Sequence, residues 1–151
     1  MVILRKQKKC LDNGANIETR NKYNDTPLIL ASFCGYTDII KLLIGAGANI
    51  EAKDNYETTS LIYACINRNI ENRNIEILKL LIHAGANIET QNQMGLTAFD
   101  YASQKGHEDI TDYLTEVRKE ISCFKNNPMK LTVDAPLIPK LPKKRVSHDA
   151  L

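Results

Sequence analysis

The pentapeptide Gly-Ala-Asn-Ile-Glu occurs three times in this chain, and this repetition constrains the fold more than any other feature. The copies begin at Gly14, Gly47 and Gly85, so the intervals between them are 33 and 38 residues. Other landmarks keep the same two intervals, among them Thr26, Thr59 and Thr97, and Ala31, Ala64 and Ala102. Self-similarity with a period of about 20–50 residues is typical of solenoids and other repeat architectures.

The longer second interval has a visible origin in a local duplication. The sequence Asn-Arg-Asn-Ile-Glu occupies residues 67–71 and occurs again at 72–76. Without one copy, every repeat would return to 33 residues. Because an insertion costs least in a flexible turn, we place the duplication between the two helices of the second repeat. We expect a solvated loop there; contact of its arginines with nucleic acid is the alternative.

Each repeat carries the pattern of two short helices. Thr26-Pro27 predicts a helix start, since a threonine hydroxyl can cap a helix and proline is tolerated at its first position. Small and apolar residues follow at helical spacing until Gly35, and a second apolar helix is predicted at 38–44. One such pair cannot bury its own apolar face, so neighbouring pairs must stack. The sequence therefore predicts an all-α solenoid of helix-turn-helix units.

These residues resemble the ankyrin repeat family, whose unit reads roughly G-x-T-P-L-H-x-A-A-x-x-G-H, then a leucine-rich helix, then G-A-D-V-N. The matches in order are Thr26-Pro27-Leu28, Ala31, Gly35, Leu42-Leu43 and Gly47-Ala48-Asn49-Ile50, with Gly95, Thr97, Ala102 and Gly106-His107 in the last repeat. We expect an ankyrin-repeat domain at 1–125 and a flexible, disordered Pro/Lys-rich tail at 126–151. The domain would contain a half repeat at 1–23 and full repeats at about 24–56, 57–94 and 95–125.

The chain also departs from the family pattern. The histidine that follows T-P-L in the family is replaced by Ile29, Ile62 and Asp100, so its usual hydrogen bonds between repeats should be absent. The turn position that favours glycine in the family carries Asn24 in the first repeat and Glu57 in the second, and only the last repeat has glycine there, Gly95. Asparagine tolerates a positive φ better than glutamate does. We therefore expect a correctly folded but modestly stable array.

The two ends of the array are more polar than its middle. Lys6 and Gln7 stand where the middle repeat has isoleucines, and Thr111 and Thr115 do so in the last repeat. A solenoid needs polar substitutions where stacking stops. In the same part of the last repeat, one apolar helical face continues through Ile110, Tyr113, Leu114, Val117 and Ile121. An alternative for residues 1–13 is the broken edge of a once longer array.

Composition excludes several classes of protein. No apolar run reaches the roughly 18–20 residues that cross a bilayer, and the N-terminus lacks the pattern of a signal peptide. The four cysteines are dispersed and the three histidines do not cluster with them, so we expect no metal, no cofactor and reduced thiols. No catalytic residues and no small-molecule substrate are predicted, and the chain is not expected to be an enzyme. We expect a monomer in the cytoplasm or nucleus, or in a host cytosol if the source is an intracellular bacterium or virus.

The resemblance implies partner binding through the finger turns and the inner helices that line a concave face. Position by position, this gives the candidate residues Tyr23, Asp25, Phe33, Tyr56, Thr58, Ile66, Met94, Leu96, Gln104 and Lys105. Tyr23, Tyr56 and Met94 recur at one position of successive repeats, and such residues are enriched in interface cores. We interpret the two tyrosines as the apolar centre of a partner site. The alternative is that each ring merely packs on the neighbouring finger.

The C-terminal tail makes the chain basic, since the rest of the sequence is close to neutral. Within it, Lys140, Pro142, Lys143, Lys144 and Arg145 resemble a short nuclear-import motif. A solvated charged tail is the alternative. For the whole chain we expect a module, an adaptor or scaffold, that binds an unidentified protein, without membrane or nucleic-acid contact. The competing hypothesis is a degenerate or truncated remnant of a larger ankyrin protein with no partner of its own.

Overall fold

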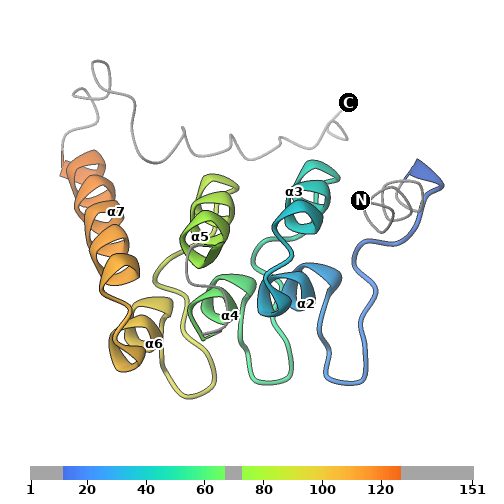
Figure 1. Cartoon of the computed structure of the whole chain (residues 1–151), viewed down its shortest axis with the longest axis horizontal. Helices are drawn as coiled ribbons and strands as arrows, with labels where there is room; N and C mark the ends of the chain where they lie inside the picture. The colour runs from blue at the N-terminus through green and yellow to red at the C-terminus, as the bar shows by residue number, and fades with distance from the viewer. Residues whose placement is uncertain (1–11, 67–72, 127–151) are drawn as a thin grey trace.

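The computed structural model describes residues 12–66 and 73–126, and this part of the chain is built from helices and turns. The helices, in chain order, are α2 (Pro27–Cys34), α3 (Thr37–Gly45), α4 (Ser60–Ile66), α5 (Arg73–His83), α6 (Ala98–Lys105) and α7 (Glu108–Asn126). Figure 1 shows α2, α4 and α6 side by side in one row and α3, α5 and α7 in a second row. Three long loops, the fingers, extend beyond the first row. The predicted all-α solenoid is confirmed.

The first helix of a repeat begins and ends where the sequence predicts. The Thr26 hydroxyl accepts a hydrogen bond from the Ile29 amide at 3.3 Å, and Gly35 terminates α2 with a φ of 77°. Helix α6 begins with a capping box, in which the Asp100 carboxylate accepts a bond from the Thr97 amide at 2.8 Å. Asp100 replaces the family's histidine, and it stabilises the start of its own helix instead.

The core runs through the whole stack between the two rows of helices. Helix α4 packs against both α2 and α6, and α5 packs against both α3 and α7. The largest fully buried apolar side chains come from every repeat: Leu28, Ile40, Ile62, Leu78, Leu81, Ile110, Leu114 and Val117. The predicted apolar face of α7 is confirmed, since Ile110, Tyr113, Leu114 and Val117 are buried and Ile121 is half-buried.

The repeated pentapeptide joins each repeat to the next. The Glu18 carboxylate accepts a hydrogen bond from the Asn49 amide at 2.7 Å, and the Glu51 carboxylate accepts one from the Asn87 amide at 2.8 Å. At the last copy, Glu89 forms an ion pair with Arg118 of α7 at 2.7 Å. The glutamate of the motif therefore bridges neighbouring repeats, and Arg118 supplies the donor where no further pentapeptide follows.

The duplicated segment, residues 67–76, begins directly after α4 and ends within α5. Residues 67–72 lie outside the described part of the chain, but 73–76 form the first turn of α5. Asn74 is buried. The expectation of a solvated loop across the whole of 67–76 is therefore wrong for residues 73–76, which belong to the second helix of the repeat.

Several predictions concern residues outside the described ranges. These are the expectations for Lys6, for Gln7 and for the half repeat before residue 12, and those for the basic tail after residue 126. Among the helices of 12–66 and 73–126, no helix has both the length and the apolar character that crossing a membrane requires.

Candidate functional site

The fingers are built on one hydrogen-bonding plan, which starts from an asparagine or aspartate at the base of each. In the first finger the Asn21 side-chain oxygen accepts bonds from the amides of Tyr23 at 2.9 Å and Asp25 at 3.0 Å. Asp54 accepts bonds in the same way from the amides of Tyr56 and Thr58, and Asn92 from those of Met94 and Leu96. This plan fixes the direction in which each finger tip points.

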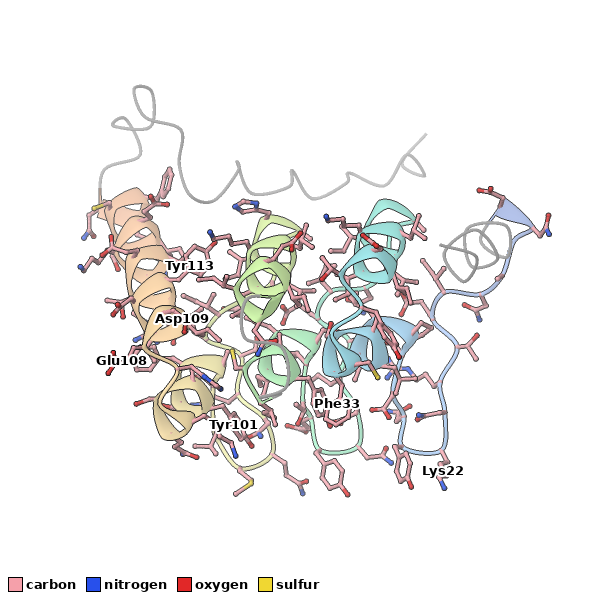
Figure 2. All side chains as sticks on the ribbon, viewed as in Figure 1. Lys22, Phe33, Tyr101, Glu108, Asp109 and Tyr113 are labelled. Carbon is pink, nitrogen blue, oxygen red and sulfur yellow. The ribbon has the colours of Figure 1, made fainter. Side chains whose placement is uncertain are left out.

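Neighbouring fingers are also joined through their backbones. The Tyr23 carbonyl accepts a hydrogen bond from the Asn55 amide at 3.2 Å, and the Tyr56 carbonyl accepts one from the Gln93 amide at 2.9 Å. These bonds hold Tyr23, Tyr56 and Met94 at the same level of successive fingers. The tips point away from the helices, as Figure 2 shows at Lys22 on the first finger.

The side chains along this line of finger tips are open to solvent. Tyr23 is 51% exposed, Tyr56 60% and Met94 75%. Large apolar side chains that remain exposed in a row differ from singly scattered ones, which need no explanation. The exposed fractions also limit the alternative interpretation, since neighbouring fingers leave about half or more of each of these residues uncovered.

Two of the candidate residues lie elsewhere than the sequence suggests. Thr58 is buried, and its amide donates to Asp54, so it supports the second finger from within. Asp25 is only 9% exposed, and its carboxylate accepts a bond from the Asn21 side-chain amide at 3.0 Å. Both were expected on the outer finger surface. That expectation is wrong, because the closing of the turn draws these side chains inwards.

A hollow of about 320 Å³ lies between the first two fingers and the helices behind them. Phe33 of α2 and Tyr63 of α4 form part of its wall, with their rings edge to face at a centroid distance of 5.7 Å and an interplanar angle of 86°. Figure 2 shows Phe33 just above the fingers. The lining residues are Asn21, Tyr23, Asp25, Ile29, Leu30, Phe33, Asp54, Tyr56 and Tyr63.

Asp54 and Tyr63 were missed by the sequence analysis, although both stand at recurring positions. The Tyr63 hydroxyl donates a hydrogen bond to the Asp54 carboxylate. Burial raises the pKa of the Tyr63 hydroxyl above its ordinary value, and the hydrogen bond and negative charge of Asp54 raise it further. The hydroxyl therefore stays protonated and remains a donor. The available signal was the Asn, Asp, Asn series at 21, 54 and 92.

The remaining candidates spread over the same face without joining the hollow. Ile66 ends α4 and is half-buried against the core, and Leu96 is half-buried at the base of the third finger. Gln104 and Lys105 are exposed at the end of α6. The structure thus brings Tyr23, Asp25, Phe33 and Tyr56 together around one hollow, and Met94, Gln104 and Lys105 are not part of its lining.

Within 12–66 and 73–126, no group of three His, Cys, Asp or Glu side chains could hold a metal ion. Cys65 is fully buried, and burial raises the pKa of its thiol, so the reactive thiolate is disfavoured.

Family models match the sequence from residue 5 to residue 115. A model of ankyrin repeats in three copies matches residues 5–92, and a model of ankyrin repeats in many copies matches residues 70–115. The chain belongs to the ankyrin repeat family. Ankyrin repeats are generally protein–protein interaction modules and are typically not enzymes. The ankyrin chain has no significant match among curated proteins.

Proposed function

We propose that this ankyrin chain is an adaptor or scaffold that binds a protein partner through its finger tips and the adjoining ends of α2 and α4. The observation that carries the proposal is the row of exposed Tyr23, Tyr56 and Met94 side chains on fingers that are hydrogen-bonded to one another. Tyrosine side chains on a rigid support lose little conformational entropy on binding, and the flexible methionine side chain can adapt its shape to a partner surface.

The same face has features of an interface beyond its apolar tips. Phe33 and Leu30 are 48% and 41% exposed on α2, directly behind the first finger. An apolar centre surrounded by polar groups is the usual composition of a protein interface. Lys22, Asn55 and Gln93 stand beside the apolar tips on successive fingers and supply such a polar rim.

The experiment is an affinity capture with the intact chain, followed by the double variant Tyr23→Ala, Tyr56→Ala. We expect the double variant to retain its helical circular dichroism and to bind the captured partner at least about tenfold more weakly, since buried tyrosines contribute 1–2 kcal/mol or more at interface centres.

Tyr36 offers a matched control for this capture. It is 55% exposed, like the finger tyrosines, but it lies in the turn between α2 and α3. Tyr36→Ala should leave the affinity unchanged. Equal affinity of the double variant and the intact chain would contradict the proposal. Failure of the intact chain to retain any partner would favour the remnant hypothesis.

A further inference from the structure

The hollow between the first two fingers is aromatic on its sides. Tyr23 and Tyr56 approach it from the fingers, and Phe33 and Tyr63 from the two inner helices. The faces of aromatic rings carry negative electrostatic potential and attract cations within about 6 Å of the ring centroid. The chain already shows this attraction at its own finger, where the Lys22 ammonium lies 4.9 Å from the centroid of the Tyr23 ring.

Two carboxylates add negative charge to the same hollow. Asp25 and Asp54 are only 9% and 5% exposed, and both contribute to the lining. Asp54 already accepts bonds from two backbone amides and from Tyr63, and the Asp25 carboxylate accepts one from Asn21. A partly desolvated carboxylate attracts a cation more strongly than an exposed one, because the effective dielectric constant around it is lower.

Within residues 12–66 and 73–126, these two carboxylates have no ion-pair partner. The ion pairs among the described residues involve neither Asp25 nor Asp54. Arg20 of the first finger directs one guanidinium nitrogen to the carbonyls of Asn24 and Lys53 at 2.9 and 2.7 Å. The hollow therefore combines two carboxylates that form no ion pair among the described residues with four aromatic side chains in its lining.

We propose that the hollow binds an arginine side chain presented by an extended segment of the protein partner. This inference rests on the proposed function and specifies its chemistry. A guanidinium stacks on aromatic faces and is more weakly hydrated than the ammonium of lysine, so it loses less on entering a half-enclosed apolar space. A volume of about 320 Å³ is at the small end of ligand pockets, which suits one long side chain.

The test uses three short peptides, Ac-Ala-Arg-Ala-NH2, its citrulline analogue and its lysine analogue, titrated into the ¹⁵N-labelled full chain. Citrulline keeps the shape of arginine and removes its charge. We expect saturable shifts in the amide resonances of the first two fingers with the arginine peptide, weaker binding of the lysine peptide and no detectable binding of the citrulline peptide. Equal binding of the arginine and citrulline peptides would overturn the proposal. Resonance shifts confined to residues outside the first two fingers and their helices would also overturn it.

The chain itself supplies the variant that isolates the charge. Asn21 and Asn92 occupy the position of Asp54 in the other two fingers and accept the same pair of backbone hydrogen bonds. Asp54→Asn should therefore preserve the turn, and we expect it to weaken the arginine peptide about three- to tenfold. Glu116→Gln removes one negative charge from the exposed face of α7 and should have no effect. An equal effect of both variants would show general electrostatic attraction and contradict the proposal.

The two proposals fail in different ways. If the arginine peptide does not bind but Tyr23→Ala, Tyr56→Ala still abolishes capture of the partner, the finger surface binds a protein of other chemistry. If capture is unaffected by the double variant and the arginine peptide still binds the hollow, the hollow is a cation site separate from the partner interface.

Discussion

The second and third fingers share one architecture but differ in charge at the residue at their base, which is Asp54 in the second finger and Asn92 in the third. Asp54 and Asn92 each accept two backbone hydrogen bonds through one side-chain oxygen. The other polar atom of the side chain accepts a hydrogen bond in Asp54 and donates one in Asn92. Tyr63 donates to the Asp54 carboxylate, whereas the Asn92 side-chain amide donates to the Tyr101 hydroxyl at 2.8 Å. In each finger, one atom of the Asp54 or Asn92 side chain accepts the backbone hydrogen bonds that shape the turn. The other atom determines whether the side chain carries a negative charge.

In the first finger, the side chain at the base has a third kind of hydrogen-bond partner. Leu30 stands where the other repeats have tyrosine, so Asn21 directs its side-chain amide to Asp25. Asp25 in turn occupies the position of Thr58 and Leu96, which are neutral. Negative charge is thus concentrated between the first two fingers. At the corresponding positions one repeat further along, Met94 stands in place of a tyrosine and Ile66 in place of Phe33.

The largest expected effect tests the difference between the two tyrosine contacts. Tyr63→Phe removes a hydrogen bond to a carboxylate, and Tyr101→Phe removes one between neutral groups. Hydrogen bonds to charged groups contribute about 1.5–3 kcal/mol and neutral ones about 0.5–1.5 kcal/mol, and both sites are partly exposed. We expect losses of about 2 kcal/mol for Tyr63→Phe and about 1 kcal/mol for Tyr101→Phe in the free energy of unfolding, measured with urea. Equal losses would contradict the assigned role of the charge.

A smaller effect should come from the backbone at the finger turns. Asn24, Glu57 and Gly95 occupy equivalent positions with φ values of 67°, 58° and 74°. A left-handed backbone costs an ordinary residue about 1–2 kcal/mol, and a glycine at this position would remove that cost. Part of this stabilisation is offset because glycine has more conformational freedom to lose on folding. Glu57→Gly should therefore raise the free energy of unfolding by about 0.5–1 kcal/mol, in thermal or urea unfolding.

The other two fingers provide the controls for this substitution. Asn24→Gly should change stability by only a few tenths of a kcal/mol, because asparagine tolerates this conformation. Gly95→Ala should lower stability by about 1 kcal/mol through conformation alone, since an added Cβ there would meet no atom within 4 Å. A destabilising Glu57→Gly would show that the Glu57 side chain makes a contribution larger than its backbone cost.

The fold could be predicted from sequence because its determinants are local and repeated. Thr26 and Gly35 mark the ends of a helix by their own chemistry, and the 33-residue period forces the stacking of neighbours. The role of Glu18 and Glu51 in joining repeats could not be deduced, because a recurring glutamate carries no sign of which backbone amide it will meet. The sequence predicts that the duplication follows the first helix of the second repeat. The burial of Asn74 depends on packing that the repeat alone does not reveal.

The candidate site was only partly predictable. Tyr23 and Tyr56 recur at one position, which is enough to align them once the solenoid is known. The inward direction of Asp25 and Thr58 depends on turn geometry, and the hollow depends on how Phe33 and Tyr63 from two different helices meet. The import motif at 140–145 stays a prediction, because those residues lie outside the described ranges.

The central claim, that a protein partner covers the finger tips, is tested most directly by oxidative footprinting of the complex with the captured partner. Hydroxyl radicals oxidise exposed tyrosine and methionine side chains, and mass spectrometry reports each residue separately. We predict strong protection of Tyr23 and Tyr56, weaker protection of Met94 and unchanged oxidation of Tyr36, which is equally open in the free chain. Protection of Tyr36 with no change at Tyr23 and Tyr56 would contradict the account.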